Sequence, residues 1–430
     1  MIRALMLLAI IASALPVSGD AEMQAQAERA RDYVAEAVDA LVERDMPGGV
    51  ADIDRMERAN RYETERPPVY AGIFKAAYEA TGEERFREFF LEVADLCVAM
   101  KQPEGGYARV AYVKQVGADE THTGRMTFRN SRSLKAVQVV LNAYDLTGEQ
   151  RYLDSAVETA EFTLSAQHPE GAWQSDYPAP EGSYLELLML NDLVTISSVR
   201  ELMLVHSHTG DPRYMEAIRR TGQWFIDWQL EEPTPGWAQH YGRDGRPAWG
   251  RRFEPPCACS APTIEAIDVL IDIHLLTGDE RYLAPIPAAV AWLDRARTGE
   301  NQWARFYELK TGRPLYAAID DAPWLRYERD DGLYKGYAQW GSWPFERRRA
   351  RWERLQEIGR EALLAAETGP PEPEELRQLL EQDAEWVHAT CSEGGTLAGF
   401  ADDPGNPNTL RSNVERAARW LAAYDSTAVE

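Results

Sequence analysis

Arginine and aromatic side chains gather in a few segments of this chain, and these residue types suit chemistry on a charged sugar. The arginines form two groups: Arg125, Arg129 and Arg132, then Arg243, Arg246, Arg251 and Arg252. Aromatic residues accompany them: Trp173, Tyr177, Trp237, Tyr241, Trp249, Trp303 and Tyr307. A guanidinium group binds a carboxylate through two parallel hydrogen bonds, and aromatic rings stack on the apolar faces of sugars. The combination predicts a site for an acidic polysaccharide or oligosaccharide.

A pattern that occurs four times indicates how these residues are positioned. Each copy reads Thr-Gly, an acidic residue, one variable residue, Arg and an aromatic, and the copies occupy residues 81–86, 147–152, 209–214 and 277–282. The glycine suits the left-handed position that ends a helix, and the acidic residue suits the first turn of the next helix. A repeat of this kind determines the architecture of a chain. We therefore expect four helical hairpins.

The residues around these turns support the same conclusion. Leu134, Val137 and Leu141 precede the second copy at helical spacing, and Leu153 and Val157 follow it in the same way. A small residue or an amide followed by an aromatic then closes each unit: Gly106-Tyr107, Ala172-Trp173, Gly236-Trp237 and Gln302-Trp303. We predict an all-α protein, an α/α toroid (an incomplete α/α barrel). The chemistry is expected in the loops opposite the Thr-Gly turns.

The two ends of the chain differ from this repeat. Arg3 precedes an apolar run that ends in small residues, which is typical of a cleavable secretory signal over residues 1–19. We expect the toroid to cover residues 20–344 and a helical extension to cover residues 345–430. An arginine run near 347–354 is expected to lie on a solvated helix face. The signal predicts a secreted or periplasmic protein.

The net charge of −24 argues against nucleic acid or an anionic membrane as the main partner. No zinc-ligand spacing, nucleophile elbow, phosphate loop or dinucleotide fingerprint is present in the sequence. An acidic substrate would therefore have to be attracted by a local group of cations.

Several segments, in the same order, resemble the family 10 pectate lyases of bacteria. The most specific is 303–314, which begins Trp303-Ala-Arg-Phe-Tyr-Glu308 and is similar to that family's WARFYE segment. The segments 172–178, 190–192, 251–254 and 336–344 resemble further motifs of the family. The resemblance extends over roughly residues 65–344 and implies the α/α toroid and cleavage of an acidic polysaccharide by β-elimination.

The resemblance also implies roles for individual residues. In that family an arginine removes the C5 proton of a galacturonate, and the matching position here is Arg251. Arg305 is expected to clamp the substrate carboxylate. An arginine base needs a second cation close by, because a guanidinium normally stays protonated to about pH 12. Arg252, adjacent to Arg251, is expected to be this cation. The further substrate-binding residues that we predict are Arg129, Trp173, Tyr177, Trp237 and His240.

Calcium is the cofactor that the resemblance implies, with Asp192 and Asn191 as ligands. Calcium requires several oxygen ligands, and here the set is incomplete. Arg129 stands where the family has an aspartate, and a second family carboxylate is replaced by Leu193. A basic residue expected after Arg305 falls near residues 319–320, where the sequence has Ile and Asp. One hypothesis is that Arg129 pairs with the substrate carboxylate directly.

The sequence leaves two alternatives open. A glycoside hydrolase on the same fold would need two carboxyl groups about 5–10 Å apart, and Asp176, Glu186 and Asp192 lie in the expected loops. A binding protein without activity would keep the aromatic residues and lose the arginine base.

Overall fold

The computed structural model describes residues 21–49, 61–112, 125–318, 325–329, 333–391 and 407–427, so the predicted signal 1–19 and residues 319–320 lie outside the described part. The chain is predominantly helical, which confirms the all-α prediction. The helices are α1 (Ala21–Asp45), α2 (Pro67–Thr81), α3 (Glu84–Met100), α4 (Arg132–Thr147), α5 (Gln150–Ser165), α6 (Val194–Thr209), α7 (Pro212–Asp227), α8 (Ser260–Thr277), α9 (Ile286–Arg295), α10 (Phe345–Thr368), α11 (Pro373–Cys391) and α13 (Pro407–Thr427). None of them combines the length and the hydropathy that a membrane-spanning helix requires.

The four Thr-Gly turns end helices α2, α4, α6 and α8, as predicted. Gly82, Gly148, Gly210 and Gly278 all have left-handed backbones, with φ between 67° and 73°. The threonine of each turn also has a fixed role. The hydroxyl of Thr209, for example, donates to the Val205 carbonyl at 2.9 Å and accepts the Asp211 backbone N–H at 3.3 Å. The turn therefore ends one helix and begins the next, with the threonine hydroxyl bonded to both.

In the second and third copies of the repeat, the arginine and the aromatic residue tie the outer helix to the outer helix before it. Arg213 binds Glu161 of α5 at 2.7 Å, and the hydroxyl of Tyr214 donates to the same carboxylate at 2.8 Å. In the second copy, Arg151 and the hydroxyl of Tyr152 contact Asp95 of α3 in the same way. In both copies the arginine and the aromatic residue therefore have a structural role.

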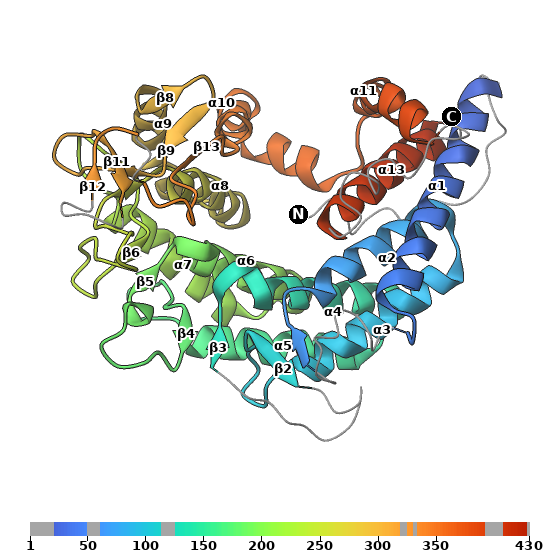
Figure 1. The fold of residues 1–430 in the computed structure, drawn as a ribbon, viewed down its shortest axis with the longest axis horizontal. Helices are drawn as coiled ribbons and strands as arrows, with labels where there is room; N and C mark the ends of the chain where they lie inside the picture. Colours follow the sequence, from blue (N-terminus) through green and yellow to red (C-terminus); the bar gives the residue numbers. More distant parts are fainter. Residues whose placement is uncertain are drawn as a thin grey trace.

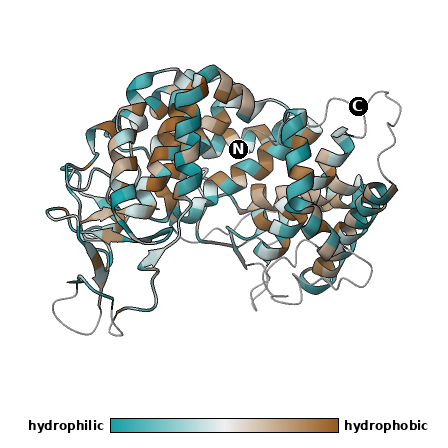
Figure 2. Ribbon diagram, turned by 90° about the horizontal axis from the view of Figure 1, so that it is seen from above, coloured by the Kyte–Doolittle hydropathy of each residue, from teal (hydrophilic) through white to brown (hydrophobic). Residues whose placement is uncertain are grey.

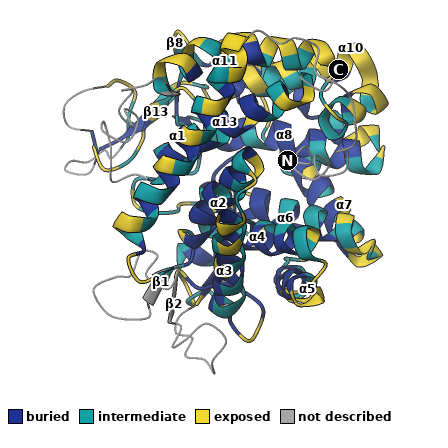
Figure 3. Cartoon of the chain, turned by 90° about the vertical axis from the view of Figure 1, so that its right-hand side faces the viewer, coloured by how far each residue is buried: buried dark blue, intermediate teal, exposed yellow. Residues whose placement is uncertain are grey.

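The hairpins are arranged in a curved double layer, which Figure 1 shows as an arc from α1 and α2 through α4 and α6 to α8. Helices α2, α4, α6 and α8 each contact the next one, while α3, α5 and α7 pack behind α2, α4 and α6. Buried residues follow the inner helices (Figure 3), and apolar residues lie where helices face one another (Figure 2). This is the predicted α/α toroid.

The three C-terminal helices extend the arc and return to its beginning. Helix α10 packs on α8, whereas α13 packs on α2 and α1, and α11 packs on α13 and α1. Figure 1 shows these helices across the side of the molecule that the hairpins leave open. The predicted extension thus connects the two ends of the toroid.

The arginine run at the start of α10 corrects one expectation. Arg347 and Arg354 are exposed, but Arg348 and Arg351 both bind Asp268 of α8, at 3.2 and 2.7 Å. Arg200 of α6 reaches the same carboxylate at 2.6 Å. The expected solvated face is therefore wrong for the inward-facing arginines, which join three helices through one nearly buried aspartate.

Short antiparallel strands connect the loops at the end of the hairpins opposite the Thr-Gly turns. They are β1 (Arg61–Glu63), β2 (Val110–Tyr112), β3 (Met126–Thr127), β4 (Asp176–Tyr177), β5 (Leu188–Met189), β6 (His240–Tyr241), β7 (Ala258–Cys259), β8 (Arg297–Gly299), β9 (Gln302–Ala304), β10 (Phe306–Tyr307), β11 (Pro314–Ala317), β12 (Leu325–Arg326) and β13 (Trp340–Gly341). The pairs β3–β4, β5–β6 and β7–β10 each link one inter-hairpin connection to the next. These pairings hold the loops that carry the predicted site in one layer.

Candidate active site

The connections that lead from one hairpin to the next are anchored by buried tryptophans. The indole N–H of Trp173 donates to the Thr163 carbonyl at 2.7 Å, and that of Trp237 donates to the Phe225 carbonyl at 3.0 Å, both near the end of the preceding outer helix. Trp303 is anchored in the same manner, and all three side chains are fully buried. Their ring faces pack in the core, so the expected sugar-stacking role of Trp173 and Trp237 has no support in the structure.

A tyrosine four residues after the tryptophan completes two of these connections. The hydroxyl of Tyr241 accepts the Ala238 backbone N–H at 2.8 Å and donates to the Trp228 carbonyl at 3.1 Å. Tyr307 makes the equivalent pair of bonds with Ala304 and a carbonyl at the end of α9. Most of the Trp-Ala-x-x-Tyr segment is thereby used to build the loop.

The third residue of this segment faces the site in both connections. It is Gln239 in one and Arg305 in the other, and Arg305 Nη1 donates to Gln239 Oε1 at 3.3 Å. Gln239 Nε2 donates in turn to Glu254 Oε1 at 3.2 Å. Equivalent positions of neighbouring repeats therefore meet around one carboxylate.

Glu254 is the centre of the site and is fully buried. Arg251 binds it through one edge of its guanidinium, with Nη2 to Oε1 at 2.6 Å and Nε to Oε2 at 2.9 Å, and the Arg251 backbone N–H adds a bond of 2.8 Å. Tyr337 donates its hydroxyl at 3.0 Å and Asn191 donates its amide at 3.3 Å. This carboxylate therefore holds the side chains that donate to it in fixed positions, and removing it would leave a buried charge and several donors unpaired.

The ion pair between Arg251 and Glu254 shifts the pKa values of the two groups in opposite directions. The hydrogen bonds that Arg251 donates to Glu254 raise the pKa of Arg251 above its ordinary value, although partial burial acts against this. Burial acts to raise the pKa of Glu254, but bonds from Arg251 outweigh it and hold that pKa below 4.5. Arg251 is consequently a cation in the free protein, and its side chain is 37% exposed, so part of its guanidinium faces solvent. The pairing positions the residue and also stabilises its protonated form.

Arg305 is held by a backbone carbonyl and by aromatic rings, whereas Arg251 is held by an ion pair. Its Nε donates to the Ala338 carbonyl at 2.6 Å, and its guanidinium lies over the rings of Tyr337 and Trp343, at 4.6 and 5.5 Å from their centroids. Within the part of the chain that the structure describes, no carboxylate pairs with it. Stacking on aromatic faces fixes the plane of a guanidinium and leaves its remaining N–H groups available for an anion.

Two strained turns bring the neighbouring residues to the site. Asn130 and Ser131 before α4 both have φ of 59°, and Asp192 and Leu193 before α6 have φ of 50° and 61°. Consecutive left-handed residues other than glycine are uncommon and are held only by the surrounding structure. The two turns contact each other. They place the Asp192 carboxyl group where burial raises its pKa and where the charges of Arg251, Glu254, Arg129 and Arg305 all act on it.

Arg129 lies beside this group in a fixed position. Its Nη2 binds both oxygens of Asp176, at 2.9 and 3.1 Å, and the Thr127 hydroxyl donates to the same carboxylate at 2.9 Å. The structure thus brings together Arg129, Asn191, Asp192, Arg251 and Arg305.

The remaining predicted residues are placed less centrally. His240 is 1% exposed, neither ring nitrogen has a hydrogen-bond partner among the described residues, and burial lowers its pKa to about 4. It is therefore a neutral imidazole beneath the site. Tyr177 is half-buried with its ring edge against Phe162, and Arg252 is exposed.

The residues at the predicted calcium position are a poor set of ligands for this cation. Asn191 donates its amide to Glu254, and the one carboxylate, Asp192, lies among guanidinium groups. Among the described residues no three His, Cys, Asp or Glu side chains are grouped so as to hold a metal ion. Calcium prefers six to eight oxygen ligands, several of them charged.

Three residues of the site were not assigned from the sequence: Glu254, Gln239 and Tyr337. The spacing of Arg251 and Glu254 gave a signal for the first, because residues three apart can pair across one turn. The equivalence of Gln239 and Arg305 within the Trp-Ala-x-x-Tyr segments gave a signal for the second. Tyr337 lies far from both in sequence, and only the fold brings it to Glu254.

Comparison with known proteins agrees with this architecture. Residues 111–297 match the family described as pectic acid lyase. A family 10 polysaccharide lyase from Cellvibrio cellulosa superimposes with a TM-score of 0.50 at 17% identity, covering 68% of this chain and 97% of that one. An aspartate-to-alanine mutant of that lyase in complex with trigalaturonic acid gives the same TM-score and identity and is covered to 98%. No curated protein matches in sequence. The chain resembles the pectic acid lyase family in sequence and has an α/α toroid fold.

Proposed function

We propose that this protein is a polysaccharide lyase that cleaves a uronate-containing, pectate-like polysaccharide by β-elimination. The observation that carries the proposal is the convergence of Arg129, Arg251 and Arg305 on one layer of loops in a chain of net charge −24. The match to the pectic acid lyase family supports the same class of reaction. We also propose that the protein is exported, since the first 19 residues have the pattern of a secretory signal.

In the proposed reaction a base removes the C5 proton of a uronate, the electron pair forms the C4–C5 double bond, and the bond from C4 to the glycosidic oxygen breaks. The departing oxygen takes up a proton from solvent. The C5 proton is weakly acidic until the charge of the adjacent carboxylate is neutralised. Arg305 is the proposed clamp for this carboxylate, because its free N–H edge is fixed by Tyr337 and by the Ala338 carbonyl.

Arg251 is the proposed proton acceptor at C5. Its ion pair with Glu254 stabilises the protonated form, so the deprotonated fraction is small at neutral pH. The proposal therefore implies that turnover increases with pH across the alkaline range in which the protein stays folded. A profile that is flat in this range would assign Arg251 to charge stabilisation and leave the base to another group.

Arg129 is proposed to supply the second positive charge near the substrate carboxylate. Asp176 holds its guanidinium next to Asp192, in a position where the resemblance implies a calcium ligand. We propose that Arg129 takes the place of calcium in neutralising the substrate carboxylate. We expect activity to persist in the presence of a chelator.

A panel of purified polyuronates, followed by ultraviolet absorbance of unsaturated ends, tests the proposal. Wild-type protein should generate absorbance, with and without chelator, and Arg251→Ala should not, although it keeps the fold. Full activity of Arg251→Ala would exclude this residue as the base, and absence of absorbance with every polymer would exclude a polyuronate lyase.

A glycoside hydrolase is the second candidate, and one observation favours it. Asp192 has a raised pKa and Glu254 a lowered one, and carboxyl pairs whose pKa values are separated serve as acid and base in hydrolases. Glu254 is fully buried and surrounded by donors, which is unfavourable for activating water. A rise in reducing ends without absorbance would identify the hydrolase.

A further inference from the structure

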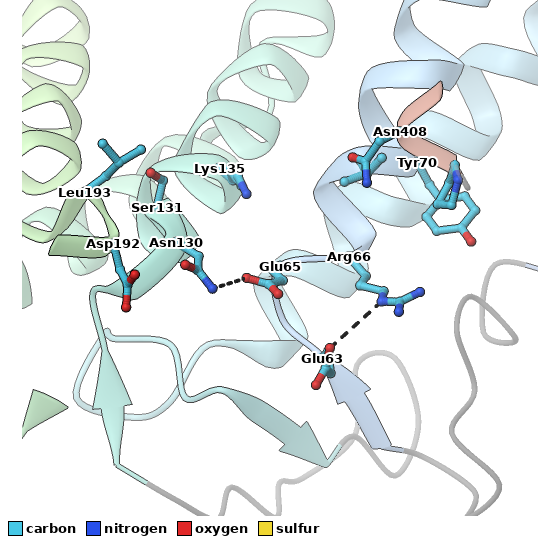
Figure 4. Close-up of a pocket in the computed structure, with 12 residues that line it drawn as sticks. Glu63, Glu65, Arg66, Tyr70, Asn130, Ser131, Lys135, Asp192, Leu193 and Asn408 are labelled. Atoms are coloured by element: carbon cyan, nitrogen blue, oxygen red, sulfur yellow. Dashed lines mark hydrogen bonds and ion pairs between the residues drawn. The ribbon is translucent and has the colours of Figure 1, made fainter. Parts of the chain in front are cut away.

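A pocket of about 860 Å³ lies beside the candidate active site, between the N-terminal ends of α2, α4, α6 and α13. Figure 4 shows its lining, with Asp192 at the edge next to the active site and Asn408 of α13 on the far side. Ligand pockets generally measure about 300–1,000 Å³, so this one admits more than one sugar unit. Asp192 belongs to both the pocket and the active site, which makes the two continuous.

Two of the three acidic residues that line the pocket, Glu63 and Glu65, are paired with arginines of the chain. Glu65 is paired with Arg132 at 3.0 Å and accepts the Asn130 amide at 3.0 Å. Glu63 lies 3.7 Å from Arg109 and 3.9 Å from Arg66. These contacts, two of which are drawn in Figure 4, remove much of the repulsion that an anionic ligand would meet.

Lys135, in contrast to the paired glutamates of the pocket, has no partner among the residues that the structure describes. It extends from α4 toward the space between α4 and α2 (Figure 4) and has neither an ion pair nor a hydrogen bond with any residue that the structure describes. Its side chain is partly buried, and burial lowers its pKa, with Arg132 and Arg411 acting in the same direction and Glu65 against it. A partly desolvated ammonium group without an anion is a favourable position for a carboxylate.

We propose that this pocket binds a second uronate unit of the substrate, beyond the unit that reacts, and that Lys135 pairs with its carboxylate. This inference rests on the proposed function, because it assumes an acidic polysaccharide at the active site. The wall formed by Pro407 and Asn408 comes from α13, outside the segment that matches the lyase family. The C-terminal helix therefore limits how far the polysaccharide extends in this direction.

The test uses oligogalacturonates of increasing length, starting from the dimer, with wild type, Lys135→Met and Asn408→Trp. Methionine keeps the length of the lysine side chain and removes its charge, and tryptophan fills the pocket from the α13 wall. Lys75→Met is the matched control, since Lys75 lies on α2, is paired with Glu79 and does not line the pocket. KM and kcat are measured from unsaturated ends, and binding is measured by calorimetry.

Lys135→Met should raise KM for the longer oligomers about tenfold, the effect of losing one charge-assisted hydrogen bond, and should leave kcat unchanged. Asn408→Trp should have the same effect, and Lys75→Met none. Wild-type values in Lys135→Met at every length would overturn the pocket proposal while the lyase proposal stands. Binding that depends on Lys135 without any cleavage would instead overturn the lyase proposal alone. If wild type neither binds nor cleaves the oligomers, both proposals fail.

Discussion

Replacing Glu254 by glutamine is the most informative perturbation of the site. Glutamine keeps the shape of the side chain and removes the charge that holds Arg251. One of its two terminal atoms becomes an N–H donor that faces other donors. At the Oε2 position these are the Arg251 backbone N–H and Nε, at 2.8 and 2.9 Å.

The expected loss of stability follows from these contacts. A buried donor left without an acceptor costs about 1–3 kcal/mol, and two donors are affected. Removing one partner of a buried ion pair costs about 3–5 kcal/mol, but Arg251 is 37% exposed and regains part of its hydration. We therefore expect Glu254→Gln to lower the free energy of unfolding by roughly 2–4 kcal/mol at pH 7, and to lose turnover because Arg251 and Tyr337 are no longer held.

The effect should also depend on pH in a defined direction. Glu254 has a lowered pKa in the folded protein, so its contribution is fully present above its ordinary pKa of 4.5 and is lost as the pH falls through its folded value. Urea unfolding at pH 7 and at pH 4 and below should show a difference between the two proteins that narrows in acid. Glu300→Gln, at an exposed position, is the control and should change stability by less than about 0.5 kcal/mol. A Glu254→Gln protein as stable as wild type at pH 7 would refute the central role of this carboxylate.

Three further predictions concern the clamp, the repeat turns and a buried acid. Arg305→Ala should lower kcat/KM on pectate about 30–100-fold through loss of a bidentate pair, with little change in stability. Arg305→Lys should recover only part of the lost kcat/KM. Equal activity of Arg305→Ala and wild type would exclude Arg305 as the carboxylate clamp. Gly210→Ala should lower the free energy of unfolding by roughly 1–2 kcal/mol, because alanine is strained in the left-handed conformation, and an unchanged denaturation midpoint would contradict this. Glu201 is fully buried, and burial raises its pKa to about 8. Relative to Glu201→Gln, the free energy of unfolding of wild type should therefore fall by about 1.4 kcal/mol per pH unit between pH 4.5 and 8. If chemical denaturation gives the same pH dependence for both proteins, this acid is not protonated in the folded protein.

The fold was predictable because its signals are local. Each Thr-Gly turn contains the residues that end one helix and start the next. A pattern of six consecutive residues is therefore enough to predict each helical hairpin. Which arginines of α10 face the neighbouring helices could not be predicted from local signals. Arg348 and Arg351 resemble surface residues in sequence, and their partner Asp268 lies about 80 residues earlier in α8.

The site was predictable in its arginines and less so in its aromatic residues. A tryptophan in a loop can stack on a ligand or anchor the loop, and the sequence does not distinguish the two. Trp173 and Trp237 anchor their loops, since each indole N–H reaches a carbonyl 10 or 12 residues earlier. The burial of Glu254 likewise depends on Tyr337 and Gln239, which reach it from separate connections.

The most direct test of the proposed reaction is the mass of its products in water labelled at oxygen. β-Elimination breaks the C4–oxygen bond without adding water, so each new non-reducing end should be lighter by one water molecule and should carry no label from cleavage. Unsaturated ends that equal the new reducing ends in number, and that are absent with Arg251→Ala, are the result we predict. Products that gain the mass of one labelled water at each cleavage would show hydrolysis and contradict the account.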